Sequence, residues 1–453
     1  MTPIRTLIPT ALLVSTAIAQ VPDGYYVFTT FGTAGRQGVF LQHPRNPDAP
    51  IPIEGLNPDL AWNPNGRAGG SCVQIRASDG ALLVGERAEV GNSVDLHVIR
   101  LFGVSVVFDQ LFSAGTAGRA GEIPQLAQLP DGRILIAATD LTAGPLANVQ
   151  TNSYGLEGIG IVDPIGGGVT PIPITNPAVF QSGVFNALAA SPDGQTAYIG
   201  NYLSTTVGEV WALPIPAGGN ATLIATVTPV SHLGFDLDGN LMIVTLNGPP
   251  NVWKHDFATN TTSPVTTAIG PLNTIALETV TGNFAVGTAN GGMPPRSLFW
   301  VEPDGTDHLI VSPNFATISG VDVRHNPRTF GDSAASANGY AWRVRPNPGG
   351  SPLIGSSVFS LTLDPPTPTQ TDLGVALIAT APAAAPIPVL GVELLVDPNQ
   401  LLASIVLPAT GTQTLPLPIP ADSSLAGVTL FVQGLHLDGP AFTSTAGLRV
   451  TLF

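Results

Sequence analysis

The sequence has very little cysteine, lysine or charge. Cys72 is the only cysteine and Lys254 the only lysine among 453 residues, and charged residues make up only 10% of the chain. A single thiol cannot form an internal disulfide, so packing has to hold the fold together. Cys72 fits better as a small buried apolar residue than as a nucleophile. Long solvated helices need glutamate and lysine on their exposed face, so the shortage of charge argues against a helical protein.

Positive charge is the scarcer sign, since 16 lysines and arginines stand against 31 aspartates and glutamates, for a formal net charge of −15. Such a surface repels phosphate backbones and offers no cationic patch to anionic lipid. Beyond the N-terminus, no apolar run reaches the length of about 18 residues that a membrane-spanning helix requires. We therefore expect neither a nucleic-acid partner nor a membrane span.

Residues 1–19 have the pattern of a signal peptide. Arg5 supplies the positive start, residues 6–16 are mostly apolar or small, and an Ala-Ile-Ala motif precedes Gln20, as signal peptidase requires. The apolar run is too short for a membrane anchor, which is the alternative reading of such a segment. We expect cleavage before Gln20 and a protein that is secreted, periplasmic or held at the cell surface.

Glycine and proline are abundant, at 51 and 44 residues, and apolar residues make up 44% of the chain. This composition suits many short strands joined by tight turns. Asp-Gly turns followed by apolar runs recur along the chain, and a tight hairpin needs the positive φ that glycine adopts freely. The turns begin at Asp79, Asp131, Asp193 and Asp238, with degenerate copies at Thr281 and Asn326.

These turns are spaced by about 45 to 60 residues, and the four-stranded blades of β-propellers repeat at about 40 to 50 residues. Each turn follows a strand-like run, such as 186–191, so six turns predict six blades. The last repeat lacks outer strands, and the N-terminal runs 24–31, 38–43 and 50–54 can supply them and close the ring. The extra residues 143–160 are expected to form a surface loop.

The repeat of Asp-Gly turns followed by apolar runs ends near residue 331. The following region is rich in proline and has seven short strand-like runs without the repeat, which is the pattern of a β-sandwich. The sequence therefore predicts an all-β protein with a signal peptide over 1–19, a six-bladed β-propeller over 20–331 and a small β-sandwich domain over 332–453. The seven runs are 358–363, 374–380, 389–396, 404–408, 414–419, 427–433 and 448–453.

The runs SPDGQTAYIGN (191–201) and FDLDGNLMIV (235–244) resemble the repeats of secreted bacterial six-bladed propellers of the NHL, YVTN and gluconolactonase-like kind. The resemblance covers about residues 21–331. The segment from LPLPIPADSS to STAGLRVTLF resembles the sandwich region that ends many secreted proteins of planctomycete-type bacteria. The resemblance implies a fold but no single activity, because propellers host binding and several chemistries.

The gluconolactonase-like resemblance also implies a divalent metal in the central channel, held by a Glu, an Asn and an Asp from the innermost strands. Oxygen ligands of this kind suit calcium. Glu122 and Asn186 match the first two positions. Where the Asp is expected the sequence has Ser231 and His232, and Asn273 is a loose positional substitute. The incomplete ligand set argues against a metal-dependent lactonase or related hydrolase, which stays the alternative function.

Other candidate sites favour structural interpretations. Asp236, Asp238 and Asn240 can be read as calcium ligands, but an ordinary turn uses the same residue types and the spacing of a full calcium loop is absent. The seven histidines are scattered, and the five tryptophans suit blade packing better than sugar stacking. The Gly-x-Ser-x-Gly motif of serine hydrolases does not occur.

We therefore expect an exported, non-catalytic propeller that binds a polysaccharide or protein of the extracellular space or cell envelope through its blade loops. A purely structural component of the envelope is a third interpretation. No cofactor is expected, with Ca²⁺ in the channel as the alternative, and the chain is expected to be a monomer.

Overall fold

The computed structural model covers the whole chain, and the fold is described here over the residues that it places. None of these forms a helix long and apolar enough to cross a membrane. The predicted signal peptide, residues 1–19, lies outside them. The described residues are 21, 24–31, 38–42, 50–58, 60, 69–76, 79–150, 155–180, 183–236, 239–247, 250–265, 272–277, 284–288, 297–301, 307–311, 317–324, 328–330, 343–346, 352, 357, 359–364, 373–407, 413–425, 428–438, 441–445 and 447–452.

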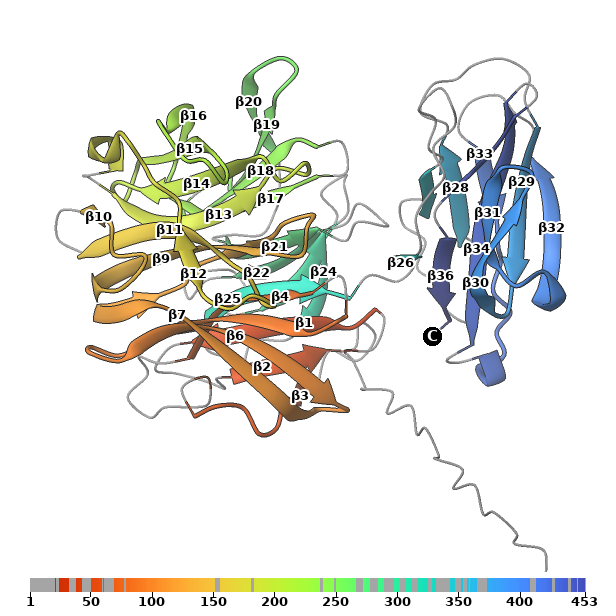
Figure 1. Ribbon diagram of the computed structural model, residues 1–453, viewed down its shortest axis with the longest axis horizontal. Helices are drawn as coiled ribbons and strands as arrows, with labels where there is room; N and C mark the ends of the chain where they lie inside the picture. The colour runs from red at the N-terminus through yellow and green to blue at the C-terminus, as the bar shows by residue number, and fades with distance from the viewer. Residues whose placement is uncertain are drawn as a thin grey trace, which may run out of the picture.

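Four antiparallel sheets of four strands each resemble propeller blades (Figure 1). Three of them use consecutive strands, and their hairpins confirm the short strands predicted from the apolar runs. Their orders are β13 (Val184–Ala190), β14 (Thr196–Tyr202), β15 (Gly208–Pro214), β16 (Thr222–Val227); β17 (Val230–Phe235), β18 (Leu241–Thr245), β19 (Val252–Asp256), β20 (Thr261–Val265); and β21 (Leu272–Leu277), β22 (Phe284–Thr288), β23 (Leu298–Val301), β24 (Asp307–Val311).

The fourth sheet joins the two ends of this region of the chain. Its order is β25 (Thr317–Val323), β1 (Tyr26–Phe31), β2 (Gly38–Gln42) and β3 (Ile51–Pro52). β1 pairs antiparallel with β25, so that Val27 lies opposite Asp322. The prediction that N-terminal strands complete the last repeat is thereby confirmed.

A nine-stranded sheet contains two further sets of four strands. β7 is unusually long, because its first part pairs with β6 and its last part, from Thr116 to Glu122, pairs with β9. β8 pairs with β9, and β12 pairs with β11. The strands are β4 (Gly69–Ile75), β5 (Leu82–Arg87), β6 (Ser93–Phe102), β7 (Ser105–Glu122), β8 (Leu126–Gln128), β9 (Ile134–Ala143), β10 (Val149–Gln150), β11 (Leu156–Val162) and β12 (Val169–Pro171).

The first strands of the successive sets contact one another in the order β4, β8, β13, β17, β21, β25 and back to β4. Hydrophobic packing follows the same order. Six clusters of buried side chains each combine residues of two neighbouring sets; one of them packs Val27 and Val39 against Val73 and Leu82. Each set therefore buries its two faces against its neighbours, as stacked sheets do.

The Asp-Gly turns have the geometry that the sequence predicts. Gly80, Gly132, Gly194 and Gly239 all have positive φ, between 69° and 86°. The Asp that precedes the first three glycines accepts a hydrogen bond from the backbone amide two residues further on, for example at 3.0 Å in the turn of Asp193. The degenerate turns at 281–282 and 326–327, together with Asp238, lie outside the described residues.

The prediction of a surface loop over 143–160 is wrong. β10 and the first part of β11 lie within this range, and Leu146, Val149 and Glu157 are fully buried. A 3₁₀ turn, η1 (Pro177–Phe180), follows β12 and inserts Phe180 into the core, where its ring meets that of Phe185 edge to face. Residues 143–145 are exposed, but the rest of the described range adds buried structure to this set.

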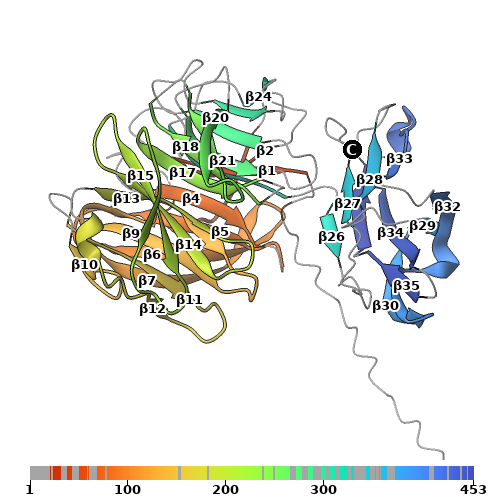
Figure 2. The same ribbon diagram turned by 90° about the horizontal axis from the view of Figure 1, so that it is seen from above.

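The C-terminal strands gather into sheets of their own (Figures 1 and 2). A six-stranded sheet has the order β26-β36-β34-β29-β32, with β35 paired to β34; β27, β28 and β33 form a second sheet, and β30 and β31 a hairpin. The bounds are β26 (Arg328–Phe330), β27 (Arg343–Pro346), β28 (Ser360–Asp364), β29 (Leu373–Ala379), β30 (Pro382–Val389), β31 (Val392–Val396), η2 (Pro398–Gln400), β32 (Leu401–Leu407), β33 (Gln413–Pro416), η3 (Ser423–Leu425), β34 (Thr429–Asp438), β35 (Ala441–Ser444) and β36 (Gly447–Thr451).

These sheets enclose a separate core. Phe359, Leu361, Val432 and Val450 belong to one buried cluster, whose described members all come from residues 359–452. β26, which the repeat predicts as the second strand of the last blade, pairs instead with β36. β1 takes the predicted position of β26 beside β25.

Candidate functional site

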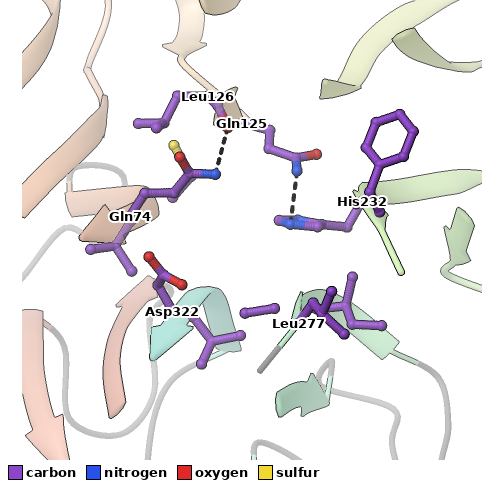
Figure 3. A pocket seen from close by; sticks show the side chains of 13 residues that line it. Gln74, Gln125, Leu126, His232, Leu277 and Asp322 are labelled. Atoms are coloured by element: carbon purple, nitrogen blue, oxygen red, sulfur yellow. Dashed lines mark hydrogen bonds between the residues drawn. The ribbon is translucent and has the colours of Figure 1, made fainter. Parts of the chain in front are cut away.

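The first strands of the sets line a pocket of about 170 Å³ (Figure 3). It lies among the first strands, where the propeller prediction puts a central channel, and we refer to it as the channel. The side chains that reach it come from β4, β17, β21, β25 and the start of β8. Its lining is mixed, with few titratable groups. The lining residues are Cys72, Val73, Gln74, Gln125, Leu126, His232, Gly234, Phe235, Ile275, Ala276, Leu277, Val321 and Asp322.

Gln125 is the main cross-link of the channel. Its Oε1 accepts the backbone amides of Leu188 and Leu233, at 2.9 and 3.0 Å, and its Nε2 donates to the carbonyl of Leu233 at 2.6 Å. These bonds fix the orientation of the amide, because its oxygen faces two donors. One side chain thus ties the start of β8 to β13 and β17, and a buried amide with all of these bonds is well satisfied.

His232 lies in the channel wall with its Nε2 2.8 Å from Gln125 Nε2 (Figure 3). Because Gln125 Nε2 is a donor, His232 Nε2 has to be the acceptor, which places the ring proton on Nδ1, 3.4 Å from Thr274 Oγ1. Burial lowers the pKa of His232 to about 3. The ring is therefore neutral at physiological pH and its acceptor nitrogen is already bonded.

Gln74 and Asp322 occupy the opposite side of the pocket (Figure 3). Gln74 Nε2 donates to the carbonyl of Leu126 at 3.0 Å. The Asp322 carboxylate accepts the amides of Ile75 and Val323, at 2.6 and 2.8 Å. Burial raises the pKa of Asp322 to about 7, although these two bonds oppose the shift. Asp322 therefore joins β25 to β4 and carries partial negative charge at neutral pH.

Asn186 and Asn273 belong to a repeated inter-sheet contact. Asn186 Nδ2 donates to the carbonyl of Val230 at 2.9 Å, and Asn273 Nδ2 donates to that of Ile318 at 2.9 Å. In each case the donor sits on the first strand of one set and the acceptor on the first strand of the next. Hydroxyl groups bridge three other boundaries: Ser231 donates to the carbonyl of Leu272, Ser319 to that of Gly70, and Ser71 to that of Ile123, which lies just before β8.

Glu122 is not among the residues that line the pocket. It ends β7, and its carboxylate lies 3.5 Å from the guanidinium of Arg87 on the paired strand β5. Burial and the charge of Asp140 raise its pKa, while Arg87 opposes the shift. Of the four metal candidates, the structure places His232 in the channel wall and Asn186 and Asn273 on the surrounding first strands, with Glu122 apart from them.

No three His, Cys, Asp or Glu side chains converge as a metal site in the part of the chain that the structure describes. At the other calcium candidate, Asp236 accepts the amide and side-chain nitrogens of Asn240 and forms an ion pair with Lys254 at 2.9 Å. The ammonium group of Lys254 thus already supplies the positive partner of this carboxylate. These contacts stabilise the turn and do not indicate a calcium site.

A buried ionic triad outside the channel was not predicted from the sequence. His97 is fully buried on β6, with Nδ1 3.0 Å from Asp109 and Nε2 3.6 Å from Glu86. Burial lowers the pKa of His97, but the hydrogen bond that its ring donates to Asp109 and the negative charges of Asp109 and Glu86 outweigh this effect and raise the pKa to about 9. The only local signal for the triad is that His97 lies inside an otherwise apolar run, 96–99.

Comparisons with known proteins reveal a distant structural likeness and no sequence family. No family model matches the chain, and no curated protein matches it. A putative 6-phosphogluconolactonase from Bacteroides fragilis aligns at 12% identity over 76% of this chain and 92% of its own, with a TM-score of 0.38. The β-propeller domain of Cps50 (Swd1) from Myceliophteria thermophila aligns at 12% identity over 60% and 94%, with a TM-score of 0.35.

The extracellular domain of a putative one-component system from B. thetaiotaomicron also aligns, at 12% identity over 76% of this chain and 46% of its own, with a TM-score of 0.35. The chain is thus an all-β protein distantly similar to β-propellers. At this level of similarity, nothing about activity or ligands transfers from these proteins.

Proposed function

We propose that the chain is an exported, non-catalytic binding scaffold, built as a six-bladed β-propeller over residues 20–331 and a β-sandwich over 332–453. The blade count is supported by the pairing inside the nine-stranded sheet, where β4–β7 form one set of four and β8, β9, β11 and β12 another. With the four separate sheets these sets number six. The ring order of contacts between first strands supports closure.

One observation carries the non-catalytic assignment, which is that the polar side chains of the channel are engaged in holding strands together. Gln125, Gln74 and Asp322 each bond to the backbone of a neighbouring first strand. His232 is neutral, and its acceptor nitrogen is bonded to Gln125. Catalysis needs a general base or nucleophile within reach of substrate. These groups are better suited to holding the first strands together than to acting on a substrate.

A neutral, polar rim is the best-supported binding surface. The segment 202–207 (YLSTTV) leads from β14 to β15 in one sheet, and 246–247 (LN) follows β18 in the next sheet. The two segments meet where Asn247 Nδ2 donates to the carbonyl of Thr205 at 2.6 Å. Residues 204–207 are exposed. Hydroxyl and amide groups without charge match the hydroxyls of a neutral polysaccharide, and Tyr202 adds an aromatic face. We therefore assign the ligand to this class.

Affinity electrophoresis of residues 20–453 in gels that contain neutral or anionic polysaccharides tests this assignment. We expect retardation by a neutral glycan, and a roughly tenfold weaker affinity for a Ser204→Ala/Thr206→Ala variant, because two hydrogen bonds contribute about 1.4 kcal/mol or more. The matched control, Thr222→Ala/Thr226→Ala, removes two exposed hydroxyls from β16 and should bind as the parent does. Equal loss in both variants would contradict the rim assignment.

The alternative function, a metal-dependent lactonase using Glu122 and Asn186, predicts a different result. A metal that binds only the folded state raises the melting temperature. We expect the same melting temperature in chelator and in excess calcium. A calcium-dependent rise that Glu122→Ala abolishes would instead favour the hydrolase and call for a screen of lactones.

A further inference from the structure

β32 is an open edge of the six-stranded C-terminal sheet. It pairs with β29 on one side, and no other strand pairs with it in the described part of the chain. Figures 1 and 2 both show it at the outer margin of the C-terminal strands. Its sequence is LLASIVL, and Leu402 and Val406 are 61% and 62% exposed. An open edge presents unpaired backbone groups that another strand can complete.

Most other outer edges of the described sheets have features that discourage such pairing. The exception is β16, which has six residues without proline or charge; its exposed apolar residue, Leu223, is 45% exposed, against 61% for Leu402 of β32. β3 and β12 are only two and three residues long. β20 contains Pro264, β24 begins at Asp307 and β33 ends at Pro416. Short length, proline and charge are the usual protections of edge strands. β32 has seven residues and none of these protections.

Charge also favours this edge. The chain has a net charge of −15, yet residues 398–421 contain no charged side chain. Two copies of the chain repel one another over most of their surfaces, because like charges oppose close approach. They can meet at β32 without bringing acidic groups together.

We propose that the chain forms a homodimer in which β32 pairs antiparallel with β32 of a second copy, centred on Ser404. The two strands are identical, so the pairing is self-complementary about a twofold axis. In this register Leu402 lies opposite Val406 of the second copy, on the exposed face of the strand, and the small Ser404 side chains meet at the axis. Ala403 faces Ile405 of the second copy on the other face, which packs against the C-terminal core.

The interface is small. A single strand pair buries less surface than the roughly 1,600 Å² of a standard protein interface. The dimer is therefore weak and depends on concentration. This proposal concerns a surface outside the rim and the channel, so it is independent of the proposed ligand, and it replaces the monomer expected from the sequence.

Oxidation of variants with one or two added cysteines tests the register. Directly opposite residues of an antiparallel pair have Cβ atoms about 5 Å apart, so Ser404→Cys should give a covalent dimer on a non-reducing gel. The native Cys72 is buried, and burial raises its pKa to about 12, so it does not compete. Leu402→Cys should give much less dimer, because position 402 lies opposite Val406 of the second copy and the two introduced cysteine side chains are therefore four residues out of register. Leu402→Cys/Val406→Cys should restore the dimer.

Sedimentation velocity over a range of micromolar concentrations tests the dimer without cross-linking. The parent chain should shift from monomer to dimer as concentration rises, and Leu402→Lys/Val406→Lys should stay monomeric. Leu223→Lys, at a 45% exposed position on the uncharged edge strand β16, is the control and should behave as the parent does. A parent chain that is monomeric throughout, or a dimer that only Leu223→Lys disrupts, would overturn the proposal.

Discussion

At the scale of single residues, two buried histidines of this protein, His232 and His97, differ in charge because their partners differ. His232 has an amide and a hydroxyl as neighbours, and burial keeps it neutral. His97 lies between Asp109 and Glu86, and these carboxylates favour the charged ring strongly enough to reverse the effect of burial. A solvent-excluded imidazolium between two carboxylates makes stability depend on pH.

The His97 triad should stabilise the fold in neutral and acidic solution and lose its contribution in alkali. The pKa of His97 is about 9 in the folded chain and about 6.5 when unfolded. Its contribution is therefore fully present below about pH 6.5 and disappears as pH rises through 9. We expect His97→Gln to reduce the free energy of unfolding by about 3 kcal/mol near pH 6 and by much less near pH 10.

Denaturant titrations at a series of pH values measure this difference. Glu157→Gln is a suitable comparison, because burial raises the pKa of Glu157 to about 8 and its destabilising ionisation falls in a lower window, between about pH 4.5 and 8. That variant should gain relative stability as pH rises. A His97→Gln deficit that stays constant from pH 6 to 10 would mean that the triad is not ionic.

The sequence located several of these residues but not their roles. Asn186, His232 and Asn273 were singled out because their positions on first strands resemble a metal site. Their hydrogen-bond partners, such as the carbonyls of Val230 and Ile318, belong to strands about 45 residues away. No local pattern reveals which distant carbonyl a side chain meets. The triad of His97 was missed for the same reason, since its members come from three strands.

At the scale of elements, small residues on the second strands determine how closely the sets approach. An added Cβ at Gly200 would lie 2.5 Å from Val230 Cγ1, on the next set, and 2.7 Å from Ala187 Cβ. Gly85 and Gly287 occupy the equivalent positions of their own sets, against Ile123 and Ile318. The glycines that end runs such as ALLVG and TAYIG are thus packing residues and not turn residues.

Gly200→Ala should therefore reduce stability, by about 1 to 3 kcal/mol, because overpacking forces the backbone of neighbouring sets apart. Gly234→Ala is the matched control on β17, since an added Cβ there meets nothing nearer than 4.0 Å. Urea denaturation of both variants measures the difference. Equal effects would indicate that strand propensity, and not contact between sets, determines the cost.

The predictions of elements succeeded where the signal was local. The Asp-Gly turns and the first strands are determined by a few adjacent residues, and the structure has them where the sequence predicts. The prediction for 143–160 failed because burial there depends on a neighbouring sheet. Glu157, for example, is polar in sequence but accepts bonds from Thr139 and Phe185 in the interior. Composition alone identifies such a segment as a loop.

At the scale of the whole molecule, two cores should unfold separately. Phe28 is fully buried in a cluster that joins β1 to β25, and Phe359 is 1% exposed in the C-terminal cluster. Calorimetry should therefore resolve two transitions. Phe28→Ala should reduce the free energy of unfolding of the core that gives the larger transition, and Phe359→Ala that of the core that gives the smaller one. We expect a loss of about 3 to 5 kcal/mol in each case. A single transition that both variants lower equally would contradict this independence.

The pairing of β1 with β25 also has a consequence for the order of events during synthesis. Thr29 hydrogen-bonds to Ser319, 290 residues further along the chain. Contacts between such distant residues form slowly, because the intervening chain must first become ordered. β1, which is synthesised early, is thus among the last strands to pair with its partner, β25. A chain that stops before residue 317 leaves β1 with a bare edge, so truncated products are expected to be captured by proteases or chaperones.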